Sequence, residues 1–131
     1  MARTSIDDGA KMYRLRIETE FDAAHKIEGY EGKCAQLHGH TYKVEVFALT
    51  KELDPIGISF DLRVLKEKLL KITARFDHSY LNDTKELGNP SVENISRYIF
   101  QNIKDKLPDR VTLDKVRVWE TPKSWCEYFE G

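Results

Sequence analysis

The sequence has few of the features that mark secreted, membrane-spanning or nucleic-acid-binding proteins. Its two cysteines, Cys34 and Cys126, could pair, but a reducing cytoplasm disfavours a structural disulfide. The chain contains no apolar run of about 18 residues, and no basic segment followed by an apolar one that would predict a secretory signal. The net charge is -1, so no strong field attracts nucleic acid. We therefore expect a cytoplasmic protein with neither membrane nor nucleic acid among its partners.

The chain also lacks internal repeats and low-complexity segments. Its 131 residues suffice for one domain that buries about two-thirds of its unfolded surface, and they are too few for two comfortable domains. Residues 1–11 are polar and show no periodicity, so we expect a loose leader ahead of the fold. The sequence thus predicts a single domain over residues 1–131.

Apolar residues recur at two different periods along the chain. They alternate with polar residues in four segments, which predicts half-buried strands over residues 13–21, 41–49, 111–119 and about 124–129. Between the second and third strands they recur at helical spacing, which predicts a helix over residues 62–75 after the N-cap Asp61, and a second helix between the N-cap Ser91 and Pro108. This order predicts an α+β fold, in which two helices cover one face of a four-stranded, mostly antiparallel sheet.

The strongest chemical signal lies in residues 34–40, Cys-Ala-Gln-Leu-His-Gly-His. Residues two apart in an extended chain point to the same face, so His38 and His40 can bind one metal ion. His25 supplies a third imidazole upstream, and three histidines with an open fourth position are a ligand set of catalytic zinc. Cys34 leaves three interpretations open. It is a group for chemistry, a small buried hydrophobic residue, or a fourth ligand that closes the site and makes the metal structural.

Two further candidates have ordinary structural interpretations beside the functional ones. His78 directly follows Asp77, so a carboxylate can orient its imidazole for acid–base chemistry. Asp is also frequent in turns, which would leave His78 merely exposed. Glu120 comes at the end of the third predicted strand, where a solvated charge is the default interpretation of a lone glutamate.

Several motifs occur together and in one order. They are Phe21-Asp22-Ala23-Ala24-His25, Cys34 with Leu37-His38-Gly39-His40, Phe76-Asp77-His78 with Leu81-Asn82, Pro90-Ser91-Val92-Glu93-Asn94, and Val118-Trp119-Glu120-Thr121. With this pattern the chain resembles the 6-pyruvoyltetrahydropterin synthase / 6-carboxytetrahydropterin synthase family over nearly all of residues 13–128. Three residues separate Cys34 from His38, which resembles the 6-carboxy-5,6,7,8-tetrahydropterin synthase branch of the queuosine and related 7-deazapurine pathways. The pyruvoyl-forming branch has two residues more.

The resemblance implies the tunnelling (T-) fold. It implies a homo-oligomer, expected to be a hexamer, in which sheets close into a barrel and active sites form where subunits meet. It also implies one Zn2+ per chain, with the ligands His25, His38 and His40.

The substrate implied by the resemblance is 7,8-dihydroneopterin triphosphate. The products would be 6-carboxy-5,6,7,8-tetrahydropterin, acetaldehyde and triphosphate. The catalytic residues would be Cys34, Asp77 and His78. Glu120 would accept hydrogen bonds from the pterin ring. Ser91 matches a family position near the pterin but also suits an N-cap, and Lys26 could meet the triphosphate or remain solvated.

Two other functions fit the same residues. The zinc, thiol and imidazole could support a 6-pyruvoyltetrahydropterin synthase or a related pterin side-chain-cleaving activity, and release of acetaldehyde separates chain cleavage from the pyruvoyl reaction. Alternatively, the protein could be a non-catalytic, zinc-stabilised pterin-binding module. That function predicts Cys34 as a fourth zinc ligand and no turnover.

Overall fold

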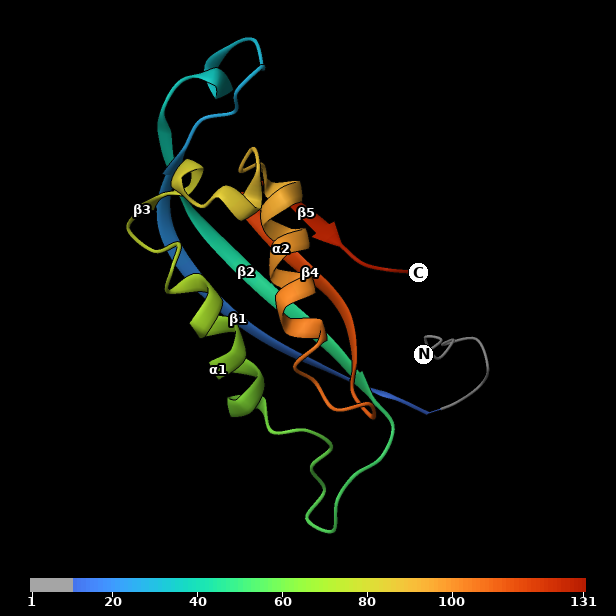
Figure 1. Cartoon of the computed structure of the whole chain (residues 1–131). Coiled ribbons are helices and arrows are strands. Elements are labelled where there is room, and N and C mark those ends of the chain that lie inside the picture. Colours follow the sequence, from blue (N-terminus) through green and yellow to red (C-terminus); the bar gives the residue numbers. More distant parts are fainter. Residues whose placement is uncertain (1–10) are drawn as a thin grey trace.

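The structure, a computed structural model, describes residues 11–131, apart from the side chain of Cys34. All of the expected leader except Lys11 therefore lies outside the described residues. Five strands, two α-helices and three short 3-10 helices follow one another in this order: β1 (Tyr13–His25), η2 (Lys33–Ala35), β2 (His38–Thr50), α1 (Leu62–Thr73), β3 (Ser79–Tyr80), η3 (Leu81–Asp83), η4 (Lys85–Leu87), α2 (Val92–Lys104), β4 (Thr112–Thr121) and β5 (Ser124–Tyr128) (Figure 1).

The sheet has five strands in the order β3-β1-β2-β4-β5, one more than the sequence predicts. The extra strand, β3, pairs parallel with β1 through only two residue pairs, whereas the other three strand pairs are antiparallel. A two-residue strand has no period, so alternation could not reveal it. The prediction of four strands was wrong for this reason, and the α+β class with two helices was right.

The first two strands are also longer than predicted, and this matters for the site. β1 continues to His25 and β2 already begins at His38, so the connection between the two strands, residues 22–40 by the predicted bounds, shrinks to residues 26–37. His25 and His38 face each other as paired residues of the β1–β2 ladder. The strand pairing therefore brings two of the candidate ligands together across the mouth of the loop.

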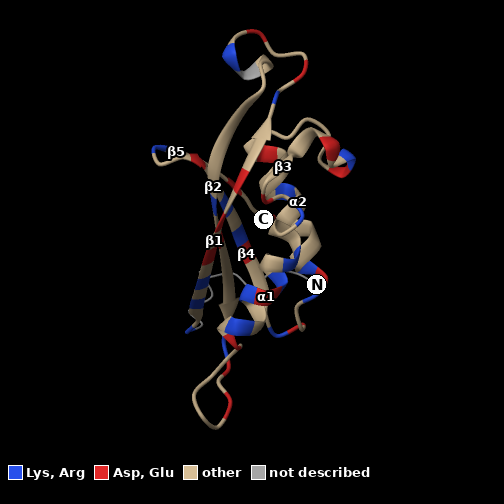
Figure 2. Ribbon diagram, turned by 90° about the vertical axis from the view of Figure 1, so that its left-hand side faces the viewer, with Lys and Arg blue, Asp and Glu red and all other residues tan. Residues whose placement is uncertain are grey.

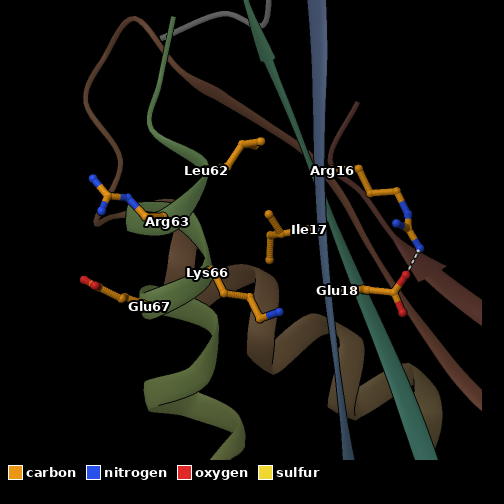
Figure 3. Close-up of a pocket in the computed structure, with 7 residues that line it drawn as sticks. All are labelled: Arg16, Ile17, Glu18, Leu62, Arg63, Lys66 and Glu67. Atoms are coloured by element: carbon orange, nitrogen blue, oxygen red, sulfur yellow. Dashed lines mark hydrogen bonds and ion pairs between the residues drawn. The ribbon is translucent and has the colours of Figure 1, made fainter. Parts of the chain in front are cut away.

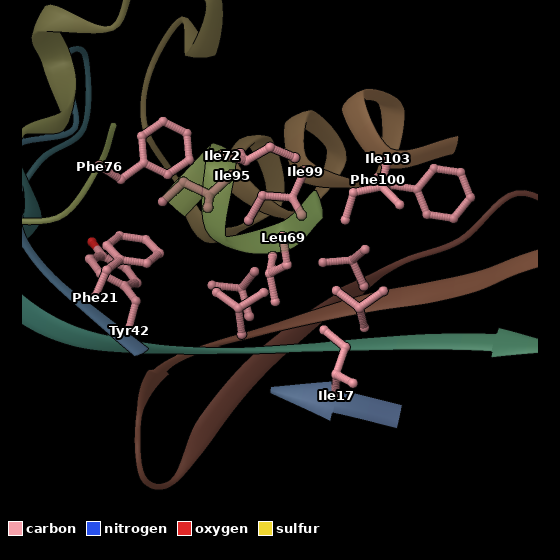
Figure 4. Packing of buried hydrophobic residues seen from close by; sticks show 14 of the residues in the cluster. Ile17, Phe21, Tyr42, Leu69, Ile72, Phe76, Ile95, Ile99, Phe100 and Ile103 are labelled. Carbon is pink, nitrogen blue, oxygen red and sulfur yellow. The ribbon is translucent and has the colours of Figure 1, made fainter. Parts of the chain in front are cut away.

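Both helices pack on the same face of the sheet, and both begin at the predicted caps (Figure 1). The Asp61 carboxylate accepts from the Arg63 N–H at 2.8 Å, and Ser91 Oγ accepts from the Asn94 N–H at 3.1 Å. The buried apolar residues of the two helices point to the sheet and form the core with its strands (Figure 4). Among the apolar residues that recur at helical spacing, the buried ones are Leu65, Leu69, Ile72, Ile95, Ile99 and Ile103. Leu62, in the first turn of α1, is exposed.

The opposite face of the sheet is charged. Figure 3 shows Ile17 pointing from β1 toward α1, while Arg16 and Glu18 point away from it. Arg16 binds Glu18 and also Glu45 of β2. Burial opposes the charge of Glu45, but hydrogen bonds from Trp119 and Arg16 bring the net pKa of Glu45 below its ordinary value. Charges of both signs are interspersed along the strands (Figure 2), in keeping with the small net charge.

Across the described residues, none of the helices is both long and apolar enough to cross a membrane.

Candidate metal and catalytic site

Three imidazoles converge where β1 ends and β2 begins. His38 and His40 lie two apart on β2, and His25 lies opposite His38 on β1. Their ligand nitrogens all lie within 4.8 Å of one another. The His25 side chain is buried, with 1% of its surface exposed, and the other two are half-buried. The strand period predicted for residues 38 and 40 thus brings both rings to the face on which His25 lies.

Backbone carbonyls fix the tautomers of two of these rings. His25 Nδ1 lies 2.7 Å from the Pro90 carbonyl oxygen, and His38 Nδ1 lies 2.7 Å from the Gln36 carbonyl oxygen. A carbonyl oxygen can only accept, so each Nδ1 donates its N–H, and Nε2 is the nitrogen that carries the lone pair in the neutral tautomer. These two Nε2 atoms lie 3.0 Å apart. Two lone pairs at this distance repel each other unless a cation lies between them.

His40 adds a third ring nitrogen to the cluster. Its Nε2 is buried and has no hydrogen-bond partner. Burial lowers the pKa of His40 below its ordinary value, and the nearby Glu120 charge opposes this only in part. The ring is therefore neutral at pH 7, as a metal ligand must be.

The three rings together fit a divalent cation. Nitrogen ligands lie about 2.0–2.1 Å from tetrahedral zinc, which places two of them about 3.3 Å apart. The hydrogen bonds from Nδ1 to backbone carbonyls are the usual outer partners of metal-bound histidines. His25, His38 and His40 therefore fit a zinc ion and leave its fourth position to a non-protein ligand or to Cys34.

A second imidazole site lies in the turn between α1 and β3. His78 Nδ1 and Asp77 Oδ2 are 3.1 Å apart, and both side chains are exposed. Asp22 of β1 holds this pair through its backbone: its N–H donates to Asp77 Oδ1 at 2.9 Å, and its carbonyl accepts from the His78 N–H at 2.6 Å. The Asp22 N–H, with the His78 ring, lowers the pKa of Asp77 below its ordinary value.

The backbone of His78 lies in the left-handed region, with a φ of 57°. Non-glycine residues in this region cost free energy, and such residues concentrate at functional sites. The side chain of Asp22 completes the group, because its carboxylate accepts from the Thr41 hydroxyl and lies within 4.8 Å of the Asp77 and His78 ligand atoms. We did not predict a role for Asp22. Its place beside Asp77 and His78 follows from the short β1–β3 pairing, which the sequence pattern did not indicate.

Glu120 is half-buried near the end of β4. Its negative charge acts to raise the pKa of both His40 and Tyr42. Tyr42 itself was predicted only as a strand residue. Its ring packs edge-on against His25 and His40, and its hydroxyl is buried without a hydrogen-bond partner. Burial raises the pKa of Tyr42, so the phenol stays protonated.

The remaining predicted residues lie on chain segments next to this cluster. Ser91 is the N-cap of α2, and the preceding Pro90 carbonyl is the group that orients His25. Lys26 directly follows His25, and its backbone bonds to the side chain of Asn82. Cys34 lies in η2, within the loop that joins His25 to His38; its side chain is outside the described structure.

The chain is similar to tetrahydropterin synthases in both sequence and structure. It is 33% identical to 6-carboxy-5,6,7,8-tetrahydropterin synthase of Haemophilus influenzae, over 91% of this chain and 100% of the relative. It is 37% identical to a putative enzyme of the same name from Archaeoglobus fulgidus, over 86% and 92% of the two chains. The structure of Caenorhabditis elegans 6-pyruvoyl tetrahydropterin synthase superposes with a TM-score of 0.79 at 27% identity, covering 93% of this chain and 98% of that one.

The sequence model of the 6-pyruvoyl tetrahydropterin synthase family matches residues 14–131. The chain belongs to this family, and the resemblance seen in the motifs is confirmed. The α+β architecture is accordingly the T-fold.

Proposed function

We propose that this protein is a zinc-dependent 6-carboxy-5,6,7,8-tetrahydropterin synthase. It would convert 7,8-dihydroneopterin triphosphate to 6-carboxy-5,6,7,8-tetrahydropterin and release acetaldehyde and triphosphate, as a step of queuosine or 7-deazapurine biosynthesis. The names of the relatives from Haemophilus influenzae and Archaeoglobus fulgidus support this product. The observation that carries the proposal is the three-imidazole cluster where β1 ends and β2 begins, together with a carboxylate–imidazole pair held by the backbone of Asp22 on the same strand β1.

The residues divide the chemistry between them. His25, His38 and His40 would hold a zinc ion, which would supply Lewis-acid chemistry toward the hydroxyl groups of the pterin side chain. His78, oriented by Asp77, has an exposed ring that can exchange protons with a bound substrate.

Three groups complete the proposed site. Cys34, in the loop between the two ligand-bearing strands, is the second proton-transfer group beside His78. Glu120 accepts hydrogen bonds from a pterin ring N–H and the exocyclic amine. Lys26 follows His25, and Ser91 follows Pro90, whose carbonyl orients His25; both are proposed to contact the substrate.

A pyruvoyl-forming reaction is the second candidate, because the family is described by that activity and the Caenorhabditis elegans structure carries its name. The spacing between Cys34 and His38 favours the carboxy product. We also propose a homo-oligomer, expected to be a hexamer with active sites between subunits, in which partner chains cover the exposed edges of the sheet. Light scattering on the purified protein measures this directly.

Product analysis tests the proposal. Zinc-loaded protein is incubated with 7,8-dihydroneopterin triphosphate, and the products are identified by mass; acetaldehyde and the carboxypterin support the proposal, whereas a pyruvoyl product supports the second candidate. Cys34→Ala should keep zinc and lose turnover by about 10²-fold or more. Loss of zinc together with activity would instead support a closed site. Cys126→Ala is the matched control, because Cys126 is half-buried beside Ser96 on the helix-covered part of β5.

A further inference from the structure

Two asparagine side chains hold the chain where it leaves β1. The Asn82 amide accepts from the Lys26 N–H at 3.0 Å and donates to the Lys26 carbonyl at 2.9 Å. The Asn89 amide does the same at Glu28, accepting from its N–H at 3.0 Å and donating to its carbonyl at 2.9 Å. Each asparagine therefore satisfies both backbone polar groups of one residue.

This pairing imitates a strand. A primary amide offers one acceptor and a donor side by side, as a peptide group does to a neighbouring strand. The two residues held, Lys26 and Glu28, are two apart, which is the spacing at which an extended chain presents its N–H and carbonyl to one side. The two amides thus hold the backbone of Lys26 and Glu28 where the chain leaves β1 and enters the turn at residues 28–29.

The two clamps belong to segments that also build the site. Asn82 lies in η3, four residues after His78. Asn89 precedes Pro90, whose carbonyl orients His25, and the Asn89 carbonyl is itself held by the Asn94 amide at 2.7 Å. Farther along the same loop, the described backbone bonds of residues 32–36 are local turns. The clamps therefore join the outgoing arm of the loop to both imidazole sites.

We propose that Asn82 and Asn89 are positioning residues for the loop over residues 26–37. By fixing its outgoing arm, they set where Lys26 and Cys34 lie relative to the three imidazoles. The inference deepens the proposed function and rests on it for the part played by Cys34. Its structural half, the clamping of the loop, is independent of any substrate.

Variants of the two amides test this with two measurements. In Asn82→Ala the Lys26 amide, and in Asn89→Ala the Glu28 amide, should exchange hydrogen with solvent about tenfold faster or more, because each loses its acceptor. Turnover of 7,8-dihydroneopterin triphosphate should fall about ten- to hundredfold in kcat, the usual effect of misplacing a reacting group. Zinc content should stay at the parent level, because neither amide contacts the imidazoles.

A conservative variant and a matched control sharpen the test. Asn82→Asp keeps an acceptor for the Lys26 N–H but sets a carboxylate oxygen against the Lys26 carbonyl, so the Lys26 amide should stay protected while kcat still falls. If Asn82→Ala fails to fold, this variant replaces it. Asn102→Ala removes an amide of the same kind, which donates to the Tyr98 carbonyl within α2, and it should change neither exchange in the loop nor kcat.

The outcomes separate the inference from the proposed function. Parent-like exchange at Lys26 and Glu28 in both alanine variants would overturn the clamp. Faster exchange with parent-like kcat would overturn the positioning role, as would a fall in kcat that follows loss of zinc. If the parent itself does not turn over the pterin, the proposed function fails, and exchange at the two amides still decides whether the clamp exists.

Discussion

The two imidazole sites differ in the exposure of their rings and in the groups to which the ring nitrogens bind, and these properties decide whether an imidazole binds a metal or transfers protons. In the three-histidine cluster, His25 is 1% exposed, and the protons of His25 and His38 are bound to backbone carbonyls. In the second site, the His78 side chain is 79% exposed and is paired with the Asp77 carboxylate. The first arrangement directs Nε2 atoms toward a cation, and the second offers a solvent-accessible ring for proton exchange.

The backbones of the two sites differ in the same way. The cluster lies on regular paired strands, in which the ladder fixes each ring by register. His78 instead occupies a left-handed turn, held by two hydrogen bonds to the Asp22 backbone. A rigid strand pair suits a chelate of fixed geometry, whereas the turn projects one ring away from the sheet. We expect loss of metal to be confined to variants of the first site.

The largest effect should come from removing a cluster imidazole. His25→Ala, His38→Ala or His40→Ala leaves two imidazoles where three converged, so we expect zinc occupancy to fall severely from about one per chain, and turnover with it. Metal analysis after dialysis measures the occupancy. Full zinc retention in all three variants would contradict the assignment of this cluster.

The second effect, in order of size, should separate the two sites. His78→Asn removes the imidazole with a residue that tolerates the left-handed region. We expect kcat to fall by about 10²- to 10⁴-fold, the usual contribution of an acid–base group, with zinc content unchanged. Parallel zinc analysis and steady-state kinetics check this. A variant that lost zinc would remove the distinction between the two sites.

A smaller effect should come from Glu120, which lies beside the cluster without being a ligand of it. Glu120→Gln keeps the shape but replaces one acceptor oxygen with a donor, so a pterin N–H would face another donor. A charge-assisted hydrogen bond contributes about 1.5–3 kcal/mol, which corresponds to roughly ten- to hundredfold weaker pterin binding. Calorimetric titration with a pterin measures it. Affinity within about twofold of the parent would make Glu120 only a solvated charge.

The sequence predicted these two sites unequally, for a physical reason. His38 and His40 are two apart on an alternating strand, so their common face followed from local period alone. The extension of β1 to His25, and the two-residue β3 that brings Asp77 and His78 beside Asp22, depend on pairing between distant segments. Periodicity contains no record of such pairing.

The same limit explains the other groups that the sequence did not predict to act in the site. These groups act through hydrogen bonds that join residues more than 50 positions apart in the sequence. They are the Pro90 carbonyl and the Asn82 and Asn89 amides. Tyr42 was correctly predicted on a strand, but its place beneath the rings follows from the packing of two strands and not from its own position in the sequence. The roles predicted for Cys34, Asp77, His78 and Glu120 rest on the motif resemblance, because local sequence patterns do not distinguish these residues from ordinary turn and surface residues.

The smallest effect concerns the turn of the second site. At a φ of 57° an alanine Cβ is strained and a glycine is not, so His78→Gly should be more stable than His78→Ala by about 1 kcal/mol, although both lack the imidazole and should be equally poor catalysts. Denaturant unfolding of the zinc-loaded variants measures the difference. The matched control is Ala74→Gly, because exposed Ala74 has a φ of -59° and glycine there should lower stability by roughly 0.5–1 kcal/mol. If glycine in place of alanine raises the stability at position 78 and lowers it at position 74, the strain lies in the turn that presents His78. If glycine lowers the stability at both positions, this turn relaxes in solution. The contrast between a strained proton-transfer site and an unstrained metal site would then rest on the side chains alone.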